Sequence, residues 1–218
     1  IIFTFFGSGA SPQMDEITGE CIVRISDIKP FPTWVGNRNQ LIVKVETDDG
    51  FHGWGESGLS GRELAVAGAV SHYREFLVGR DPRQISRHWQ EMYRSQYFEG
   101  GRVLTAAISA IDIALHDIMG RVLGVPVYQL LGGKQRDRIP CFATTGGASF
   151  DDALANCRKL IDKGWEVLRV GAASRRTYEE PDTYEPRDTI GATAEQFIQL
   201  REALGILHLP HLGHTRVG

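Results

Sequence analysis

The first part of the chain contains a short segment in which apolar and polar residues alternate with a period of two. Residues 41–46 show this alternation, which is typical of a strand that buries one face, and residues 17–28 and 51–56 are also predicted to be strands. Segments 41–46 and 51–56 are joined by residues 48–50, Asp-Asp-Gly, a sequence that favours a tight turn. We therefore predict a β-hairpin within a small antiparallel sheet.

Three helical patterns follow, in which apolar residues recur every three or four positions. The third is the longest. Its apolar stripe stops at Gly124, two residues before Pro126, as expected at the C-terminus of a helix. Together with the sheet, these helices predict an α+β domain. The apolar positions are Leu64, Ala67, Val70 and Leu77 in the first helix; Ile85, Trp89 and Met92 in the second; and Leu104, Ala107, Ile108, Ile111, Leu115, Ile118 and Val122 in the third.

The last part of the chain alternates strands with helices. Such a succession is typical of a parallel sheet whose active site lies beyond the carboxyl ends of its strands. In the final helix, Thr193 and Gln196 have the spacing of a capping box and predict the first turn there. The predicted elements are a strand over residues 139–145, a helix over 151–163, a strand over 165–170 and a helix over 193–204.

The composition is that of an ordinary globular protein, with 42% hydrophobic and 23% charged residues. The formal net charge of −3 differs from the positive net charge typical of proteins that bind nucleic acid or an anionic membrane surface. No segment has the length and polarity of a membrane span or a signal peptide. Three widely spaced cysteines, Cys21, Cys141 and Cys157, suggest neither a disulfide scaffold nor a zinc site, so we expect a cytoplasmic protein.

The segment between the first two predicted strands, residues 31–39, contains the proline, glycine and asparagine residues of a loop. Its Trp34, Asn37 and Arg38 are suited to contacting a ligand, and we predict them as substrate-binding residues. The alternative is an exposed turn without a binding role.

Two segments carry a resemblance to a known family. Residues 110–133, AIDIALHDIMGRVLGVPVYQLLGG, resemble the junction between cap and barrel in the mandelate racemase subgroup of the enolase superfamily. Residues 53–57, Gly-Trp-Gly-Glu-Ser, are similar to the end of the family's hairpin. The resemblance covers roughly residues 21–205. It implies a modified TIM barrel that binds magnesium, removes the proton beside a substrate carboxylate and stabilises the resulting enediolate on the metal.

The resemblance also implies a domain organisation. We predict a tag or read-through at residues 1–13, an α+β capping domain at 14–138, the first two βα units of a TIM-type barrel at 139–205, and an unassigned tail at 206–218. The 218 residues are fewer than the roughly 250 of a complete TIM barrel, so we expect a truncated barrel. In the family, the metal-binding carboxylates follow the third, fourth and fifth barrel strands, so we expect no metal ligand in this chain.

The second barrel strand narrows the expected chemistry. Family racemases carry Lys-x-Lys at its end, whereas the best match here is Arg169-Val170-Gly171. An arginine on this strand followed by a tyrosine on the next loop resembles the acid-sugar dehydratases. Tyr178 and Tyr184 lie in such a segment, residues 172–192. We predict all three as catalytic residues, with an ion pair at the barrel rim as the alternative for the arginine and loop packing as the alternative for the tyrosines.

The primary hypothesis is a magnesium-dependent carbon–oxygen lyase that dehydrates an acid sugar and forms a homo-oligomer. Gluconate, mannonate and galactonate are not distinguished as substrates. The alternative is a non-catalytic assembly or binding protein, in which a partner covers the exposed edges of the sheet. His208, His211 and His214 are not expected to bind metal, because the intervening Pro210 and Gly213 prevent a regular helix that would align them.

Overall fold

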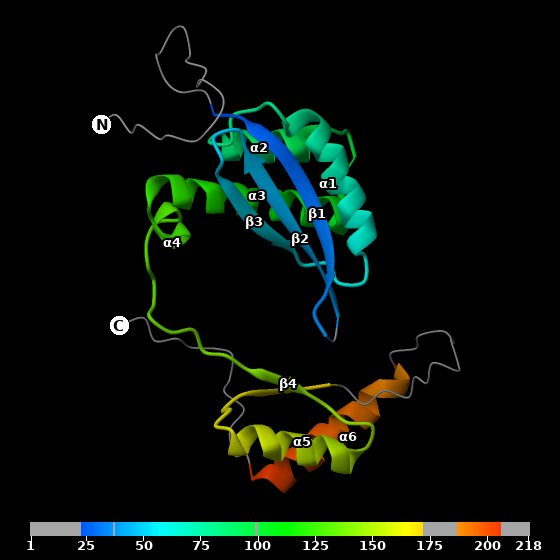
Figure 1. Ribbon diagram of the computed structural model, residues 1–218. Coiled ribbons are helices and arrows are strands. Elements are labelled where there is room, and N and C mark those ends of the chain that lie inside the picture. The colour runs from blue at the N-terminus through cyan, green and yellow to red at the C-terminus, as the bar shows by residue number, and fades with distance from the viewer. Residues whose placement is uncertain (1–22, 37, 99, 172–186, 206–218) are drawn as a thin grey trace, which may run out of the picture. The chain divides into compact units, whose positions relative to one another are not determined.

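The computed structural model describes residues 23–36, 38–98, 100–171 and 187–205. The chain divides into unit 1, Ile1–Gln135, and unit 2, Arg136–Gly218. Figure 1 shows the elements of both units. Unit 1 is an α+β capping domain, and unit 2 consists of two βα units.

Unit 1 is built on an antiparallel sheet of strands β1 (Ile25–Trp34), β2 (Asn39–Thr47) and β3 (His52–Ser57), in that order. β2 and β3 form the predicted hairpin, with Leu41 opposite Ser57 at its open end. Gly50 in the turn adopts a φ of 89°, which explains a glycine at this position. The hairpin prediction is confirmed.

The predicted loop at residues 31–39 is partly wrong, because β1 continues through Phe31 to Trp34. Pro32, which indicated a loop, lies within the strand, as does Pro30. β1 is an edge strand, and two prolines spaced two residues apart lack their N–H groups on the same side of it. The strand therefore still pairs with β2. Of the described residues in the predicted loop, only Val35, Gly36 and Arg38 lie outside both strands.

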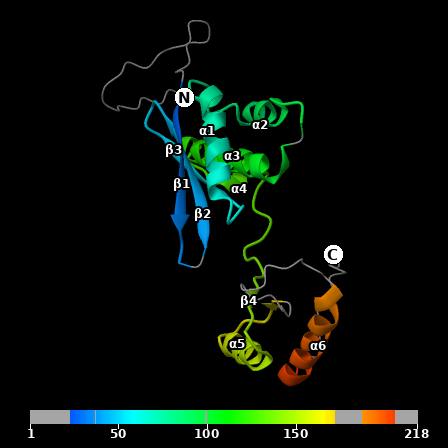
Figure 2. The same cartoon turned by 90° about the vertical axis from the view of Figure 1, so that its right-hand side faces the viewer.

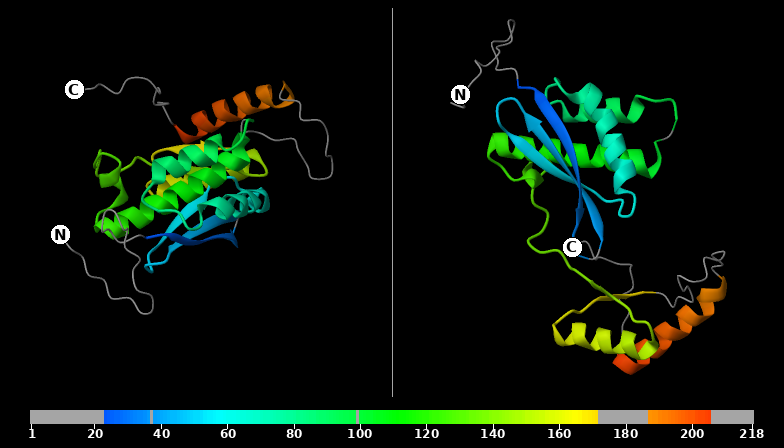
Figure 3. Two further views of the ribbon diagram at one scale, coloured as in Figure 1. Left: turned by 90° about the horizontal axis from the view of Figure 1, so that it is seen from above. Right: turned by 45° about the vertical axis from the view of Figure 1, so that its right-hand side comes forward.

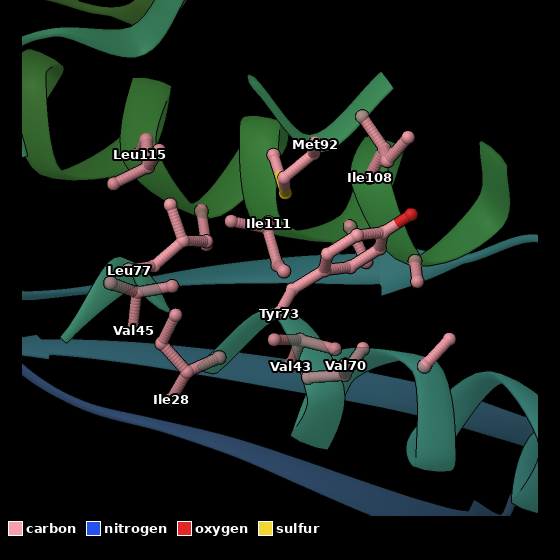
Figure 4. Packing of buried hydrophobic residues seen from close by; sticks show 14 of the residues in the cluster. Ile28, Val43, Val45, Val70, Tyr73, Leu77, Met92, Ile108, Ile111 and Leu115 are labelled. Carbon is pink, nitrogen blue, oxygen red and sulfur yellow. The ribbon is translucent and has the colours of Figure 1, made fainter. Parts of the chain in front are cut away.

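The described residues of unit 1 also form four helices: α1 (Glu63–Leu77), α2 (Ile85–Arg94), α3 (Gly101–Leu123) and the short α4 (Val127–Leu130). α1 and α3 lie on one face of the sheet (Figure 2), and α2 packs on α3. The core lies between this face and the helices. Side chains of the sheet, α1, α2 and α3 meet there (Figure 4), and they include Ile28, Val43, Val45, Val70, Tyr73, Leu77, Met92, Ile108, Ile111 and Leu115.

The predicted buried face of α1 is partly wrong. Leu64 is 79% exposed, whereas Val66, Val70 and Leu77 are fully buried. Each helical residue turns the chain by about 100°, so a residue two positions before Val66 lies on nearly the opposite side of the helix. In α3 the predicted stripe is confirmed at Ala107, Ile108, Ile111, Leu115 and Ile118, and it is wrong at its end, where Val122 is exposed.

α3 is the central helix of unit 1. It ends at Gly124, whose φ of 66° closes the helix in the left-handed conformation, as predicted. By length and composition alone, α3 is also the one helix among the described residues that is apolar enough to cross a membrane. Its apolar face, including Ile111 and Leu115, is buried in the core. We therefore interpret α3 as a core helix.

β3 lies unusually close to α3. A Cβ on Gly53 would stand 2.0 Å from the carbonyl oxygen of Ala114, and one on Gly55 would stand 1.9 Å from that of Ala110. The two glycines and two alanines thus bring the backbones of strand and helix into contact. Asp117 of α3 also accepts a hydrogen bond from the backbone N–H of Trp54 at 3.0 Å. The Gly-Trp-Gly sequence is therefore a packing motif.

An ion pair between β1 and α1 predicts a pH dependence of stability. Arg74 donates to Asp27 at 2.7 Å and holds the pKa of this carboxyl below its ordinary value of 3.8. The pair therefore adds to the free energy of unfolding above pH 3.8, and this contribution is lost as the pH falls through the lower, folded-state pKa. We expect Asp27→Asn to lower the urea midpoint at neutral pH, and the difference from wild type to close in acid. A difference that stays constant with pH would contradict this.

Unit 2 contains β4 (Ala143–Thr145), α5 (Phe150–Asp162), β5 (Leu168–Val170) and α6 (Arg187–Leu204). β4 and β5 pair in parallel, and α5 contacts both strands and α6 (Figure 3). The predicted order of elements is confirmed, although both strands are shorter than predicted. The side chain of Ser149 caps α5 by accepting from the N–H of Asp152.

The predicted capping box at the start of α6 is wrong. The helix begins at Arg187, so Thr193 and Gln196 lie in its interior. Gly191 lies at an exposed position within α6, and the helix continues through it. A threonine followed three residues later by glutamine is also compatible with a helix interior. Residues 187–192, which belong to the predicted loop at 172–192, are therefore part of α6.

Candidate functional site

The predicted substrate-binding residues of unit 1 lie at the tip of the β1–β2 hairpin. Trp34 is the last residue of β1 and pairs with Asn39. The backbone N–H of Val35 donates to the carbonyl of Arg38 at 3.0 Å and closes the turn. Trp34 is 64% exposed, and Arg38 is also exposed. The structure therefore places these two exposed residues at the same hairpin tip. Asn37 lies outside the described residues.

The outward face of the sheet carries aromatic residues that sequence reasoning missed. The rings of Phe31 and Trp54 lie 6.0 Å apart, and the ammonium group of Lys44 stands 5.5 Å from the centre of the Trp54 indole. The alternation along β3 was the available signal, because it places Trp54 opposite to the buried glycines. Phe31 falls within the predicted loop, so the sequence does not indicate that it belongs to this face.

Arg169, a predicted catalytic residue, lies in β5 and is exposed. It is adjacent to Thr144 of β4 in the parallel register. Gly171 follows the strand and donates its N–H to the carbonyl of Thr145. A Cβ at Gly171 would have its nearest neighbour at 3.9 Å, so packing does not demand glycine there. Among the described residues, nothing fills the space beside Gly171, the position that the resemblance matches to the second lysine of Lys-x-Lys.

The remaining predicted site residues cannot be placed beside Arg169. Tyr178 and Tyr184, predicted as catalytic, lie outside the described residues, as do His208, His211 and His214. Within the described ranges, no group of three or more His, Cys, Asp or Glu side chains could hold a metal ion. The described residues therefore do not fit a magnesium site.

Two hollows on the described surface of unit 1 have none of the predicted site residues in their lining. One, of about 450 Å³, is lined by residues of α2, α3 and α4 that include Arg87 and His116. Arg87 pairs with Glu91 at 2.8 Å, and His116 lies 3.3 Å from Asp112. These side chains already have partners, and the hollow includes none of the predicted site residues.

Comparison with known proteins places the described geometry in a family. Residues 22–132 match the sequence profile of the mandelate racemase/muconate lactonizing enzyme N-terminal domain. This segment covers the whole sheet and α1–α4 of unit 1. The chain belongs to this family. Its capping domain is therefore that of the enolase superfamily, as the resemblance at the junction segment indicated.

Family members similar to this chain over both units are named as dehydratases. The chain is 36% identical over 183 residues to a D-galactonate dehydratase of Variovorax paradoxus (strain S110), covering 84% of this chain and 45% of that protein. It is also 36% identical over 184 residues to a D-galactonate dehydratase of Pectobacterium atrosepticum, with the same coverage. The chain spans about half the length of the curated relatives it matches.

Solved structures of the family extend the similarity to the fold. An enolase from Pantoea ananatis, described with bound D-gluconate and Mg, is 30% identical with a TM-score of 0.71, over 84% of this chain and 51% of that one. A structure from Mesorhizobium loti is 31% identical with a TM-score of 0.76, over the same shares. The similarity of fold to these structures thus extends over 84% of the chain.

Proposed function

We propose that this chain supplies the capping domain, residues 14–138, and the first two barrel units, residues 139–205, of an acid-sugar dehydratase. The observation that carries the proposal is the 36% identity, across both units, to proteins named D-galactonate dehydratase. The enzyme would remove a proton from the carbon beside the carboxylate. It would then break the C–O bond of the hydroxyl group on the adjacent carbon, so it would be a carbon–oxygen lyase.

The hairpin tip is the proposed substrate-binding element. Arg38 is exposed, and its guanidinium group has the planar geometry that suits a carboxylate. The exposed indole of Trp34 offers an apolar face for the C–H groups of a sugar chain. Asn37 would add hydrogen bonds to hydroxyl groups. An aromatic ring and a guanidinium on one turn match the mixed character of a sugar acid.

Arg169 and one of the two tyrosines are the proposed catalytic residues. The proton beside a carboxylate is weakly acidic, so a tuned base must accept it. A tyrosine hydroxyl near a guanidinium has a lowered pKa, because the positive charge stabilises the phenolate. Tyr178 or Tyr184 would be this base, with Arg169 stabilising its ionised form.

Magnesium is proposed for the complete active site on the basis of the Pantoea ananatis structure, which is described with Mg and D-gluconate. None of the described side chains is proposed as its ligand, since they form no suitable cluster. The proposed compartment is the reducing cytoplasm, where the free thiols of Cys141 and Cys157 would persist.

Assay of the 218-residue protein against a panel of acid sugars tests this function. The panel contains D-galactonate, D-gluconate and D-mannonate, each with and without Mg²⁺, with product followed by NMR and binding by calorimetry. We expect the chain to bind at least one acid sugar, and conversion to a 2-keto-3-deoxy acid to require the later barrel strands that carry the metal ligands. Absence of both binding and dehydration across the panel would remove the enzyme function for this chain.

Unit 2 supports a second candidate, a non-catalytic assembly protein. β4 and β5 form a two-stranded sheet, and Ile139, Phe142 and Val167 beside it are exposed. Exposed strand edges and apolar side chains favour pairing with another chain. A self-associating chain would elute from size-exclusion chromatography as a homo-oligomer. A stable monomer would remove the support for both this candidate and the proposed homo-oligomer.

A further inference from the structure

Two connections of unit 1 meet at one end of its sheet: the hairpin turn at residues 35–38 and the connection from β3 to α1 at residues 58–62. The hydroxyl of Ser60 donates a hydrogen bond to the backbone carbonyl of Asn39 at 2.9 Å. Asn39 is the first residue of β2 and immediately follows Arg38. A side chain of one connection therefore holds the backbone at the base of the other.

The position of this bond is set by the unequal lengths of the strands. β3 ends at Ser57, opposite Leu41, so Asn39 lies two residues beyond the last paired position of β2 with β3. The Ser60 hydroxyl takes the place of the strand partner that Asn39 lacks on this side. A second link lies next to it, because the amide of Gln40 donates to Glu56 at 2.8 Å.

The β3–α1 connection is itself held in place. The carboxylate of Glu63 is buried and accepts a hydrogen bond from the N–H of Gly61, while the N–H of Arg62 donates to the carbonyl of Leu59. Gly61 adopts a φ of 83°, which an L-residue rarely adopts. Ser60 therefore projects from a fixed backbone.

We propose that Ser60 is a positioning residue for the ligand-binding turn: its hydroxyl holds the β1–β2 tip in the conformation that presents Trp34 and Arg38 to a carboxylate-bearing polyol. This inference rests on the proposed function. Without the bond, the tip projects past β3 supported by the β1–β2 ladder and by the Gln40–Glu56 link. Ligand binding then has to order the turn, which weakens affinity.

Hydrogen exchange tests the positioning itself. The probe is the Val35 amide, whose bond to the Arg38 carbonyl closes the turn. In the 218-residue protein, Ser60→Ala should raise its exchange rate roughly fivefold, the factor expected for the loss of one hydrogen bond. Ser60→Thr keeps a hydroxyl and should restore protection. Ser71→Ala is the matched control, because its exposed hydroxyl donates to a carbonyl within α1.

Calorimetric binding of D-galactonate, D-gluconate and D-mannonate to the same variants separates this proposal from the function on which it rests. We expect Ser60→Ala to weaken binding several-fold, with Ser60→Thr and Ser71→Ala like wild type. An unchanged Val35 exchange rate, or acid-sugar binding that Arg38→Ala abolishes and Ser60→Ala leaves intact, would overturn the role of Ser60 alone. A wild type that binds no acid sugar, although Ser60→Ala still speeds exchange, would overturn the ligand assignment.

Discussion

Replacing Gly55 with alanine is expected to destabilise unit 1 by about 3 kcal/mol, at the upper end of the cost of overpacking a core. The added Cβ would stand 1.9 Å from the carbonyl oxygen of Ala110 and 3.1 Å from the backbone nitrogen of Ala114. Both atoms belong to the backbone of α3, so no side-chain rotation relieves the contact. The strand has to move away from the helix, and the core between them opens. Urea unfolding followed by circular dichroism measures the loss.

Gly68→Ala is the matched control for this prediction. Gly68 lies in α1, and a Cβ there meets nothing within 4 Å. Alanine is the better residue in a helix interior, so this variant should gain about 0.5–1 kcal/mol. Equal unfolding midpoints for wild type and Gly55→Ala would show that β3 does not lie as close to α3 as described.

Replacing Arg169 with alanine is expected to lower the turnover number of a hybrid dehydratase that contains this chain by about 100-fold. This factor is the lower end of the contribution of general acid–base catalysis. The assay uses a hybrid in which residues 22–205 of this chain replace the matching segment of the Variovorax paradoxus D-galactonate dehydratase. The guanidinium would stabilise a phenolate base, so its removal raises the pKa of that base. The rising limb of the pH–rate profile should therefore move to higher pH.

Two further variants separate catalysis from stability. Arg169→Lys keeps the charge and loses the planar fork, so its turnover should lie between those of wild type and Arg169→Ala. Arg158→Ala removes an exposed arginine from α5 in the same unit and should leave the rate and the pH profile unchanged. If Arg169→Ala behaves like Arg158→Ala, Arg169 is a residue of the barrel rim with no catalytic role.

Much of the fold follows from periodicity. The hairpin, the long core helix and the order of the βα units were all predictable, because a period of two or of about 3.6 residues directly records which face is buried. The errors have physical causes. Pro32 indicated a loop, yet an edge strand accommodates it together with Pro30. Thr193 and Gln196 indicated a helix start, yet the backbone before them is already helical.

The candidate site was less predictable, because it depends on strand register and on contacts between distant residues. Trp34 and Arg38 were predicted together, since they are neighbours on one turn. Ser60 was not predicted, because its role depends on the register of the sheet. The last residue of β3, Ser57, pairs with Leu41 and leaves Asn39 without a partner in β3. The Gly53–Trp54–Gly55 sequence was noticed as a resemblance, and its cause, close contact with α3, became visible only in the fold.

Dehydration of D-galactonate by the hybrid enzyme is the most direct test of the proposed function. The hybrid contains every site residue proposed in this chain, and the Variovorax paradoxus protein supplies the rest. In the presence of Mg²⁺ we predict loss of water from D-galactonate and formation of a 2-keto-3-deoxy acid, detected by NMR. A hybrid that has the circular dichroism spectrum and oligomeric size of its parent, and that dehydrates neither D-galactonate nor any other acid sugar in the panel, would contradict the proposal.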